Sequence, residues 1–482
     1  MSDLSVAAPG LRLSGKLAGR LPALDVRAVT ADSRTARPGS LFVAIPGSRT
    51  DGCAYIADAV ARGAAAVLAP PGTAWPAGVP PRPLIEDARP RQRLAQFAYR
   101  LAGPPPARVV AVTGTNGKTS TVEFLRQLWA LDGRRAASLG TLGVVGGPAA
   151  AGISMTTPDP VALADTLAAL ARDGVTDAAV EASSHGLDQY RLDGLRLTAA
   201  AFTNLTRDHL DYHGDFAAYR AAKLRLFAEL LPAHGTAVAS TTLDADSQAA
   251  LDRIARERGI RLLWTGEGAG LLSAVPTADG QILRVRIDDA THEVAVALPG
   301  RFQADNLLVA AVLAQATGIA DPWALCARLT GVRGRMELAA RLGNGAAAYV
   351  DYAHTPDALE RLLTALRPHA KRLIVVFGAG GDRDRGKRPL MGAACARHAD
   401  VAIVTDDNPR SEDAAAIRAE VRAGCPDGIV VAGRRAAIAA GLGMLRPGDV
   451  LAVAGKGHEQ GQEVAGEILP FDDAGVVREL AA

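Results

Sequence analysis

The segment at residues 109–121 constrains the fold most, because an apolar, β-branched run breaks there at a glycine into a short loop. A helical pattern follows directly, in which Val122, Leu125, Leu128 and Trp129 fall on one face. A glycine shortly after this pattern is a typical helix stop. The sequence therefore predicts a strand, a glycine-containing loop and a helix in this order.

The loop has the composition of a phosphate-binding site. Gly114 and Gly117 let the backbone approach an anion, and the free amides at a helix start supply hydrogen-bond donors. Lys118 would add a positive charge at the β- and γ-phosphates, and Thr119 a hydroxyl ligand for Mg²⁺. The general phosphate-loop pattern has a further glycine where this chain has Val112, so an ordinary strand-to-helix turn stays open. The strand, the helix and the lysine together favour phosphate binding.

Lysine is rare in this chain, since 53 residues are Lys or Arg and six of these are Lys. Arginine cannot replace lysine where a compact ammonium or a deprotonatable amine is needed. We therefore expect functional roles for four of the lysines and assign Lys16 and Lys371 to chance. The four are Lys118, Lys223, Lys387 and Lys456.

Length and composition limit the class of protein. A chain of 482 residues has room for about three domains of ~150 residues each. The net charge of +2 and the lack of a long apolar run give no reason to expect a nucleic-acid partner or a membrane span. The four cysteines have no metal or disulfide spacing, and the N-terminal residues lack a signal-peptide pattern. We expect a cytoplasmic protein with reduced thiols, and nothing requires more than a monomer.

Strand-like and helical segments alternate along the chain, which predicts an α/β fold with open, mostly parallel sheets and helices on both faces. Three prolines at residues 104–106 form the clearest linker, so a second domain should begin there. The expected strands lie at residues 28–30, 40–45, 65–68, 178–182, 199–205, 346–351, 372–377, 401–405, 428–431 and 450–454, with helices near 55–62 and 217–231.

Polar clusters follow several of these strands, where the ligands of an open parallel sheet gather. Glu181 follows one strand and His209 the next, so both could face the phosphate loop. A carboxylate and an imidazole beside bound phosphates suit Mg²⁺, which takes one or two protein ligands and keeps waters. Each residue alone could equally be a capping glutamate or a surface histidine, but their joint position favours a metal site.

Several ordered motifs resemble those of the Mur ligases of peptidoglycan synthesis. The resemblance runs from Asp32 to Glu459, nearly the whole chain. Two of the motifs, at residues 380–389 and 407–410, resemble the branch of the family that adds 2,6-diaminopimelate. The motifs shared with the family as a whole lie at residues 113–120, 181–187, 204–214 and 351–356.

The resemblance implies three domains and an ATP-dependent, amide-forming reaction in the bacterial cytoplasm. The domains would be an N-terminal UDP-binding α/β domain (1–104), a central P-loop ATP-binding ligase domain (105–335) and a C-terminal Rossmann-like domain that admits the amino acid (336–482). The glutamyl carboxylate of UDP-N-acetylmuramoyl-L-alanyl-D-glutamate would attack the γ-phosphate of ATP and become an acyl phosphate. An amine of meso-diaminopimelate would then displace phosphate. ATP is a co-substrate in this reaction, and Mg²⁺ is the cofactor.

The resemblance also implies roles for individual residues. Catalytic roles would fall to Lys118, Glu181, His209, Lys223 and Arg335. The ATP-binding residues would be Gly114, Thr115, Asn116, Gly117, Lys118, Thr119, Ser120, Asn306, Asp351 and His354. The metal ligands would be Thr119, Glu181, His209 and Lys223, the last as a carbamate (N6-carboxylysine) that arginine cannot form. The UDP-substrate would be held by Ser33, Thr156, Thr157, Ser183, Gln189 and Arg191. One departure is Gln303, where the family pattern has asparagine, and it puts the adenine contact of Asn306 in doubt.

Amino-acid specificity would lie in a group of residues near the C-terminus. A guanidinium can hold the distal carboxylate of diaminopimelate through two parallel hydrogen bonds, and Glu459 can receive its ammonium. A site built for these contacts rejects L-lysine, because its buried polar groups would be left unpaired. Without the resemblance, residues 407–410 read better as a proline turn with a solvated arginine. The implied residues are Arg383, Asp407, Asn408, Pro409, Arg410, Gly455 and Glu459.

Three other functions remain open on the sequence. The nearest is another ligase of the same superfamily, such as a folylpolyglutamate synthetase or a ligase that adds L-lysine, although Arg410 and residues 183–191 argue against both. A nucleotide switch or motor would hydrolyse ATP without amino acid or UDP-substrate. A non-enzymatic binding protein on a degenerate scaffold is disfavoured, because Lys118, Glu181 and Lys223 are intact.

Overall fold

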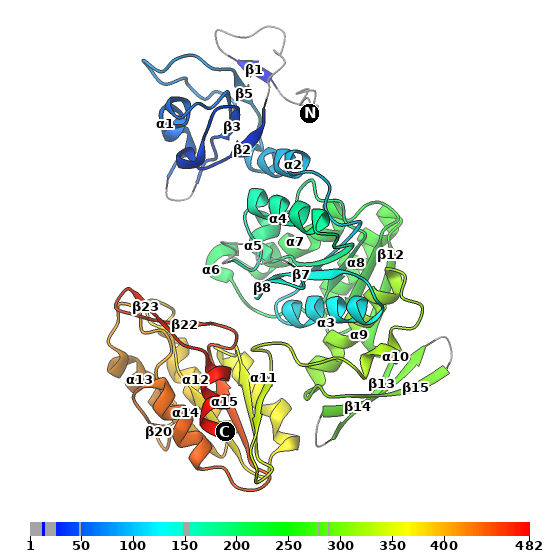
Figure 1. Cartoon of the computed structure of the whole chain (residues 1–482), viewed down its shortest axis with the longest axis vertical. Helices are drawn as coiled ribbons and strands as arrows, with labels where there is room; N and C mark the ends of the chain where they lie inside the picture. The colour runs from blue at the N-terminus through cyan, green and yellow to red at the C-terminus, as the bar shows by residue number, and fades with distance from the viewer. Residues whose placement is uncertain are drawn as a thin grey trace. The chain divides into compact units, whose positions relative to one another are not determined.

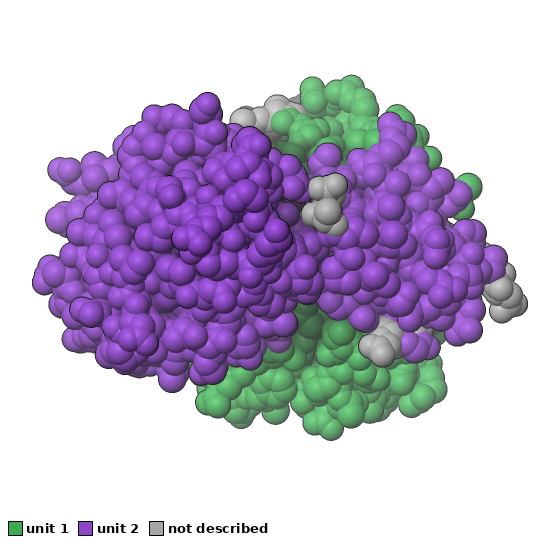
Figure 2. Space-filling view, turned by 90° about the horizontal axis from the view of Figure 1, so that it is seen from below, with its two compact units in different colours: residues 1–264, 312–320 green, residues 265–311, 321–482 purple. Residues whose placement is uncertain are grey.

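The computed structural model describes residues 12–14, 26–47, 50–147, 155–268, 270–277, 280–287 and 290–482. The chain divides into two compact units, which Figure 2 draws in different colours. Unit 1 contains residues 1–264 and 312–320, and unit 2 contains residues 265–311 and 321–482. Each unit is described here by itself.

Unit 1 begins with a five-stranded sheet in the order β1-β5-β4-β3-β2 (Figure 1). The pair of β1 with β5 is antiparallel, and the other pairs are parallel. A cluster of buried apolar side chains, including Phe42, Ile56 and Val67, packs α1 against this sheet. The strands are β1 (Arg12–Ser14), β2 (Ala28–Thr30), β3 (Ser40–Val43), β4 (Ala66–Ala69) and β5 (Leu84–Glu86); the helices are η1 (Ser33–Thr35), η2 (Gly52–Tyr55), α1 (Ile56–Ala61) and α2 (Pro90–Ala102).

A larger sheet follows in unit 1, with the order β12-β11-β10-β6-β9-β7-β8. Its core pairs are parallel, and β8 is antiparallel to β7. Its strands are β6 (Arg108–Thr113), β7 (Ala136–Gly140), β8 (Gly143–Val145), β9 (Asp177–Glu181), β10 (Ala199–Phe202), β11 (Thr236–Ser240) and β12 (Arg261–Glu267), of which β12 belongs to unit 1 as far as Trp264. Its helices are α3 (Lys118–Leu131), α4 (Pro160–Arg172), α5 (Ser184–Asp188), α6 (Leu210–His213), α7 (Phe216–Arg225), a π-helical turn η3 (Leu226–Leu230) and α8 (Ala245–Arg258).

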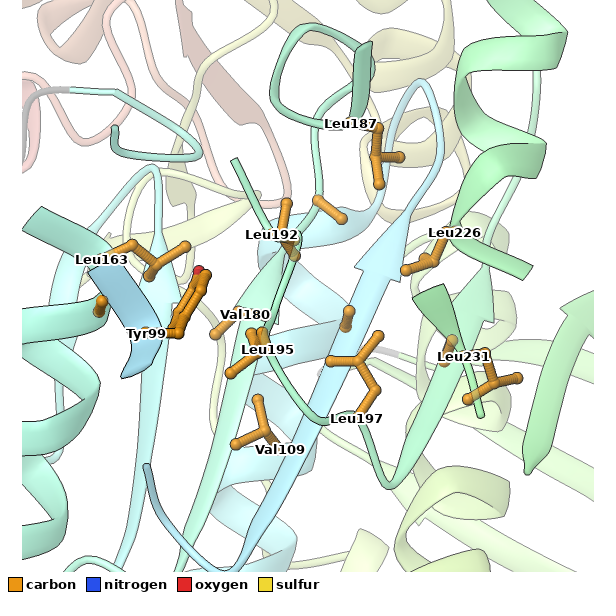
Figure 3. Close-up of a cluster of buried hydrophobic side chains, with 14 of the residues drawn as sticks. Tyr99, Val109, Leu163, Val180, Leu187, Leu192, Leu195, Leu197, Leu226 and Leu231 are labelled. Carbon is orange, nitrogen blue, oxygen red and sulfur yellow. The ribbon is translucent and has the colours of Figure 1, made fainter. Parts of the chain in front are cut away.

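Helices cover both faces of this sheet, with α3 on one face and α4, α5 and α7 on the other (Figure 1). The apolar stripe expected on α3 is buried, since Val122, Leu125, Leu128 and Trp129 are at most 2% exposed. On the opposite face, Leu163, Leu187 and Leu226 reach into one apolar core with the side chains of Val109 and Val180 (Figure 3). Burial of these stripes on a strand–loop–helix unit holds the loop after β6 in place.

Unit 2 starts with three antiparallel strands in the order β15-β14-β13. These strands, β13 (Gly270–Thr277), β14 (Gly280–Ile287) and β15 (Ala290–Val296), were not predicted from the sequence. They are followed by α9 (Arg301–Ala316), which belongs to unit 2 as far as Ala311, and by α10 (Trp323–Cys326).

The C-terminal part of unit 2 is a six-stranded sheet with the order β16-β17-β21-β18-β19-β20. Only β16 is antiparallel to its neighbour. Alternate residues of β18 face opposite cores: Val375 and Phe377 pack with α11, α12 and α13, whereas Ile374 and Val376 pack with α14 and α15. The strands are β16 (Glu337–Arg341), β17 (Ala347–Asp351), β18 (Leu373–Phe377), β19 (Val401–Val404), β20 (Ile429–Val430) and β21 (Val450–Ala454).

The helices of this part of unit 2 are α11 (Pro356–Leu366), η4 (Arg367–His369), α12 (Lys387–His398), α13 (Ala414–Arg422), α14 (Arg434–Gly443) and α15 (Asp473–Ala481). A two-stranded hairpin, β22 (Gly461–Val464) and β23 (Glu467–Pro470), follows β21. This hairpin was not predicted from the sequence either.

The prediction of an α/β protein with mostly parallel sheets is confirmed. Every strand expected from the sequence is present within a few residues, and two of them, β2 and β21, have the expected bounds. The helix expected at 217–231 begins at Phe216 and finishes as the π-helical turn η3. The domain boundaries expected after residues 104 and 335 stay predictions. No helix in the described part of the chain is long and apolar enough to cross a membrane.

Candidate active site

The loop between β6 and α3 has the backbone geometry that a phosphate-binding loop requires. Gly114 has φ 149° and Gly117 has φ 83°, and residues other than glycine rarely adopt such values. A Cβ atom on Gly114 would lie 1.9 Å from Thr203 Oγ1, so the close approach of the Thr203 side chain also requires glycine at position 114. Gly117 is the N-cap of α3 and offers no side-chain cap. Because the backbone amides at a helix start point away from the helix, this end of α3 is suited to bind an anion.

The strand end after β10 holds the phosphate loop in shape. Thr203 Oγ1 donates to Asn116 O at 2.6 Å, and Asn204 bonds the same residue twice, at 3.0 Å through each amide atom. Thr115 Oγ1 donates to Thr206 O at 3.1 Å and lies 3.0 Å from the hydroxyl of Tyr219. The segment that contains His209 and the loop that contains Lys118 thus form one hydrogen-bonded body.

Lys118 and Lys223 both reach the backbone of this loop. Lys118 Nζ donates to Gly114 O and Thr115 O at 2.9 Å each, and Lys223 Nζ donates to Gly114 O at 2.8 Å. The side chain of Lys223 is 1% exposed. Burial, and after it the charge of Lys118, lowers the pKa of Lys223 well below its ordinary value. The structure therefore holds a readily deprotonated amine beside the phosphate loop.

Glu181 ends β9, next to β6, and is 2% exposed. Its carboxylate accepts a hydrogen bond from Thr141 N at 2.8 Å and another from Thr141 Oγ1 at 3.3 Å. A Cβ on Gly140 would lie 2.1 Å from Glu181 Oε1, so the backbone of β7 approaches the carboxylate closely. These contacts fix the side chain at the carboxyl end of the sheet, the edge where the phosphate loop also lies.

His209 adopts a left-handed conformation (φ 52°) at the start of α6, and its side chain is about half exposed. Its ring packs 4.8 Å from that of His185 and 6.3 Å from that of Tyr219. Within the described residues, no three His, Cys, Asp or Glu side chains gather as a ready metal site. Three of the four predicted ligands, Glu181, the Thr119 hydroxyl and a carbamate on Lys223, are oxygen donors of the kind that Mg²⁺ prefers, and His209 would add an imidazole nitrogen.

The residues expected to hold the UDP-substrate form one hydrogen-bonded group in unit 1, apart from Ser33. Thr157 Oγ1 donates to Glu181 O at 2.8 Å and accepts from Ser183 N at 2.9 Å. Arg191 donates to Gln189 Oε1 at 2.7 Å and to the carbonyl of Thr157. Thr156 joins the group through Thr141, whose hydroxyl is 3.2 Å from its own. Ser33 lies buried in the 3₁₀ helix η1, which connects β2 to β3 of the first sheet.

Four predicted nucleotide residues lie in unit 2. Asn306 Nδ2 donates to Gln303 Oε1 at 3.3 Å, and Gln303 Nε2 donates to Arg335 O at 3.3 Å. Gln303, the residue that departs from the family pattern, is thus hydrogen-bonded both to the side chain of Asn306 and to the backbone of Arg335. Both carboxylate oxygens of Asp351 accept backbone amides, from Met336 at 2.7 Å and Ala353 at 2.8 Å.

Three rings, those of Tyr352, His354 and His458, lie next to Arg335 or to one another. The Arg335 guanidinium lies 4.6 Å from the ring centroid of Tyr352, which in turn lies 4.6 Å from the ring of His354 and 5.1 Å from that of His458. His354 Nδ1 is 2.8 Å from Tyr352 O, and burial lowers the pKa of His354. Burial and the charge of Arg335 lower the pKa of His458 to about 4. Both histidines are therefore neutral near pH 7.

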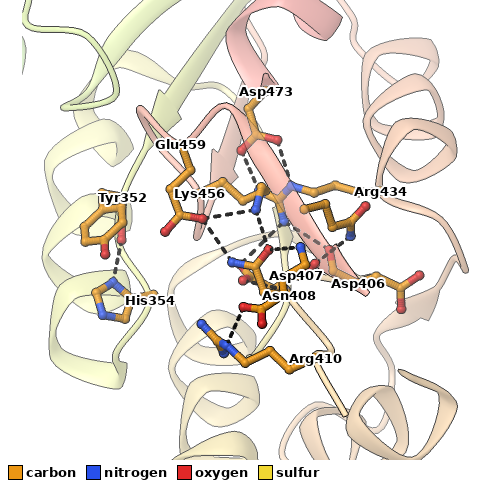
Figure 4. A network of polar contacts seen from close by, with 12 residues as sticks. Tyr352, His354, Asp406, Asp407, Asn408, Arg410, Arg434, Lys456, Glu459 and Asp473 are labelled. Atoms are coloured by element: carbon orange, nitrogen blue, oxygen red, sulfur yellow. Dashed lines mark hydrogen bonds and ion pairs between the residues drawn. The ribbon is translucent and has the colours of Figure 1, made fainter. Parts of the chain in front are cut away.

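A closed polar network connects three side chains from residues 407–410 and 455–459 (Figure 4). Asn408 Nδ2 donates to Glu459 Oε2 at 3.0 Å. Lys456 Nζ donates to Asn408 Oδ1 at 2.8 Å and to the same Glu459 oxygen at 3.1 Å. Two residues predicted to bind the amino acid are thus brought together, and a lysine singled out by its rarity joins them.

Arg410 is anchored on the hairpin that follows this network. Its backbone is left-handed (φ 53°), Nε donates to Glu463 Oε2 at 3.0 Å, and one terminal nitrogen donates to Gly381 O at 2.8 Å. The backbones also pair, since Arg410 N donates to Glu463 O at 3.0 Å and Ala465 N donates to Arg410 O at 2.8 Å. The guanidinium plane is therefore set by strand β22.

Gly455 is required by its approach to Asp407. Its φ is 121°, and a Cβ there would lie 2.5 Å from Asp407 Oδ2. That oxygen is buried and has no hydrogen-bond partner among the described atoms, with the nearest guanidinium nitrogen, on Arg434, 4.0 Å away. Arg434 is itself fully buried and pairs with Asp473 at 2.6 Å. The end of β21 therefore leaves no room for a side chain at position 455.

Arg383 is exposed on the loop after β18, and its guanidinium donates a hydrogen bond to the adjacent carbonyl of Asp382 at 3.1 Å. The buried Arg388 ties this loop to the next one by donating to Gly380 O at 3.2 Å and to Glu412 at 2.8 Å. Pro409 is buried, and a Cβ on Gly381 would lie 1.9 Å from its carbonyl oxygen. Arg383 thus projects from a loop whose base is rigid.

Several residues of these networks were not predicted from the sequence as site residues: Thr141, Thr203, Tyr219, Tyr352, Arg434, Glu463 and Asp473. Their signals were weak, because a threonine after a strand and a glutamate among exposed residues are common. Tyr352 and Arg434 could have been suspected, since one lies inside a family motif and the other follows a glycine after a short strand.

The two parallel sheets and the glycine loop between β6 and α3, with two lysines on its backbone, define an α/β protein of the phosphate-loop class. Family models then give the particular group: the Mur ligase family catalytic domain matches residues 25–100, the Mur ligase middle domain matches 112–314, and the Mur ligase glutamate ligase domain matches 334–457. The chain belongs to the Mur ligase family.

Curated relatives match over nearly the whole chain. A UDP-N-acetylmuramoyl-L-alanyl-D-glutamate--2,6-diaminopimelate ligase of Rhizobium meliloti is 50% identical, covering 97% of this chain and 96% of its own length. A ligase of the same name from Caulobacter vibrioides is 53% identical, covering 93% and 94%. A solved structure of a ligase of that name has a TM-score of 0.69 at 33% identity, covering 95% of this chain and 94% of its own.

Proposed function

We propose that this protein is an ATP-dependent ligase that joins meso-2,6-diaminopimelate to the D-glutamate of UDP-N-acetylmuramoyl-L-alanyl-D-glutamate. The observation that carries the proposal is the near-full-length identity of about half with two ligases of that name. The product would be a precursor of bacterial peptidoglycan, made in the cytoplasm by a monomer.

The chemistry has two steps. A carboxylate is a poor electrophile, so an oxygen of the D-glutamate side-chain carboxylate first attacks the γ-phosphorus of ATP, and ADP leaves. The resulting acyl phosphate then accepts an amine of diaminopimelate at its carbonyl carbon. The C–O bond breaks, inorganic phosphate leaves with the bonding electrons, and the amine loses a proton as the amide forms.

The phosphate loop would hold ATP during the first step. The amides of Gly117, Thr119 and Ser120 at the start of α3 are placed for phosphate oxygens, and Gly114, Thr115 and Asn116 shape the loop. Lys118 would add its ammonium group, which lies against the backbone of this loop and donates to Gly114 O. Arg335, Asn306, Asp351 and His354 would also contact the nucleotide. The bond between Asn306 and Gln303 would then limit how Asn306 can meet adenine.

Mg²⁺ would be held by Thr119, Glu181, His209 and a carbamate on Lys223. When bound, the cation neutralises charge that develops on the transferred phosphoryl group. The chain's own contribution to this site is the buried, readily deprotonated amine of Lys223, because CO₂ adds to the neutral form of an amine. Thr141 holds the Glu181 carboxylate in place through two hydrogen bonds.

The two organic substrates would be held by separate groups of residues. Thr156, Thr157, Ser183, Gln189 and Arg191 would hold the diphosphate and muramoyl peptide, and Ser33 would contact uridine. This proposal is supported by the hydrogen bonds that join five of these residues to one another or to Thr141.

Diaminopimelate would be bound by Arg383, Arg410 and the Asn408–Glu459 pair. The two arginines would hold its distal carboxylate, whereas Glu459 would receive its ammonium. Asp407, Pro409 and Gly455 would shape the pocket, since Pro409 is buried and Gly455 admits no side chain.

The test is phosphate release by the purified protein with ATP, Mg²⁺ and UDP-N-acetylmuramoyl-L-alanyl-D-glutamate. Three reactions are compared, with meso-diaminopimelate, with L-lysine and with no amino acid, and the product is identified by mass. Release with diaminopimelate alone is expected. Release with lysine would overturn the specificity argument from Arg410, and release without any amino acid would mean a bare ATPase.

A further inference from the structure

Lys456 is fully buried, yet its ammonium sits among the residues of the proposed amino-acid site. Its Nζ donates to Asn408 Oδ1 at 2.8 Å and to Glu459 Oε2 at 3.1 Å, and Asn408 Nδ2 donates to that same glutamate oxygen at 3.0 Å. The three side chains close a triangle of hydrogen bonds, drawn in Figure 4. No role in the reaction has so far been given to the lysine.

An ammonium can only donate, and this fixes the orientation of its partners. Asn408 must turn its carbonyl oxygen toward Lys456, a direction that the donation from Glu463 N at 3.0 Å reinforces. Its amide nitrogen must then point to Glu459. Removal of the Lys456 ammonium would take away one of the hydrogen bonds that orient the Asn408 amide. It would also take away one of the hydrogen bonds that the Glu459 carboxylate accepts.

The charge of Lys456 also matters, because its two partners are shielded from solvent to different degrees. Asn408 is 8% exposed, and the side chain of Glu459 is 32% exposed. A carboxylate held in such a site is stabilised by a charge-assisted hydrogen bond to a cation. Lys456 and Asn408 therefore both direct the Glu459 carboxylate, because each donates a hydrogen bond to its Oε2 atom.

We propose that Lys456 is a positioning residue for the amino-acid substrate, which acts by orienting Asn408 and Glu459 and so sets the preference for diaminopimelate over L-lysine. The inference rests on the proposed function. The lysine touches no substrate in this account. Lys456 fixes the two side chains that would meet the distal end of the substrate. That end carries an amine and a carboxylate in diaminopimelate, but only an amine in L-lysine.

The experiment is a kinetic comparison of Lys456→Met, which keeps the length of the side chain and removes its donors. Lys371→Met is the matched control, because Lys371 is an exposed lysine of the same unit with no assigned role. We expect Lys456→Met to raise the KM for meso-diaminopimelate about tenfold or more, the effect of losing a charge-assisted hydrogen bond. The KM for ATP should change less than about threefold, and the ratio of kcat/KM for diaminopimelate to that for L-lysine should fall.

A double-mutant cycle separates positioning from a merely structural role. If Lys456 acts through Glu459, then Lys456→Met combined with Glu459→Gln should be no less selective than Glu459→Gln alone. Additive losses of selectivity, or an unchanged KM for diaminopimelate in Lys456→Met, would overturn the inference. If Lys456→Met does not fold, as thermal unfolding would reveal, the same cycle is run with Lys456→Gln, which keeps a neutral donor.

Failure of this inference differs from failure of the proposed function. A wild-type protein that releases no phosphate with diaminopimelate contradicts the ligase itself. A wild-type protein that is active and selective, together with a Lys456→Met variant of equal selectivity, contradicts the role of Lys456 alone.

Discussion

Single side chains carry most of the argument at the phosphate loop and at the end of β21, and lysines stand out among them. Lys223 and Lys456 are buried, and Lys118 folds onto the loop that it follows. Lys387 donates to His354 O at 3.2 Å, and burial lowers its pKa. Each of the four lysines singled out by their rarity thus contacts a residue of a predicted site, whereas Lys371 is exposed. Scarcity was informative because arginine is too large and too basic for these positions.

Lys223→Ala should lose most ligase activity, because the buried amine that would carry the carbamate is gone. High bicarbonate, or a short carboxylate such as acetate or formate, should restore part of the activity by supplying the missing oxygen ligand. The measurement is the initial rate of phosphate release with all substrates, with and without the added anion. A fully active Lys223→Arg variant would contradict the carbamate, since a guanidinium does not form one.

Arg410→Ala should raise the KM for meso-diaminopimelate by about tenfold to a hundredfold and leave the KM for ATP nearly unchanged. The reason is that only the distal carboxylate of the amino acid is expected to meet this guanidinium. Arg422→Ala on α13, where the arginine is exposed, is the control. Equal changes in both KM values would show that Arg410 has no special relation to the amino acid.

Glu463→Gln should have a smaller effect in the same direction. Its carboxylate holds Arg410 Nε at 3.0 Å, so its loss frees the guanidinium plane without removing the positive charge. A competing outcome is a lower KM, which would mean that Glu463 competes with the substrate carboxylate and does not orient Arg410. Steady-state kinetics with meso-diaminopimelate as the varied substrate decide between the two.

Gly455→Ala should destabilise the protein by roughly 3 kcal/mol or more, since it combines a positive φ with a clash. The new Cβ would lie 2.5 Å from Asp407 Oδ2. Gly466→Ala, also at positive φ (84°) but with nothing within 4 Å of its Cβ, measures the strain alone. Thermal unfolding of both variants is compared, and equal shifts would mean that the approach to Asp407 carries no cost.

Among the secondary-structure elements, most strands of the parallel sheets were predicted, although β5, β7 and β11 were not, and none of the antiparallel strands β13, β14 and β15 was. Strands β17, β18 and β21 are continuous apolar runs, because both of their faces are covered by helices. By contrast, β14 has a two-residue alternation, with Leu283 and Val285 buried and Arg284 and Arg286 exposed. This pattern was present in the sequence, but a search for buried runs passes over it.

Hairpin β22–β23 was unpredictable for a different reason. All residues of β23 are exposed, including Ile468 at 76%, so burial gives it no pattern. The hairpin is fixed instead by its contacts with residues 407–410, which are more than fifty positions earlier in the chain. Pairing over such a distance leaves no local signal, and for this reason Glu463 was missed.

The loop after β21 makes the stability of unit 2 depend on pH through His458. Its pKa is lowered to about 4 from an ordinary value of 6.5, mainly by burial. The unfolded chain therefore binds a proton that the folded chain refuses between these values, so stability falls as the pH drops from 6.5 toward 4. We expect the Tm of the His458→Gln variant to fall less than the Tm of the wild type when the pH is lowered from 7 to 4.5. Parallel Tm curves for the two proteins would contradict this.

For the molecule as a whole, the three-part organisation followed from the proline linker, the length of the chain and the resemblance to a family. The residues of each site could be named because motifs carry them. What the sequence could not supply were the long-range partners, such as Asp473 for Arg434, which are 39 residues apart and meet where α14 packs against α15. Such partners decide how an active-site side chain is held.

The boundary expected after residue 335 can be tested by expressing residues 334–482 alone. This segment contains the complete sheet from β16 to β20 and the main side chains of the cores on both of its faces. We expect it to fold cooperatively, with circular dichroism of an α/β protein and dispersed amide signals. A fragment with the spectrum of an unfolded chain would show that the boundary lies elsewhere.

The burial of Lys223 and Lys456 in a chain with six lysines has a spectroscopic consequence. Isotope labelling of lysine alone would give a magnetic-resonance spectrum of 482 residues with no more than six side-chain signals, and the two buried ammonium or amine groups would stand apart from the solvated ones. A carbamate formed from ¹³C-enriched carbon dioxide would appear there as a single added line. The arginine-rich composition thus makes the state of one side chain observable in the intact protein.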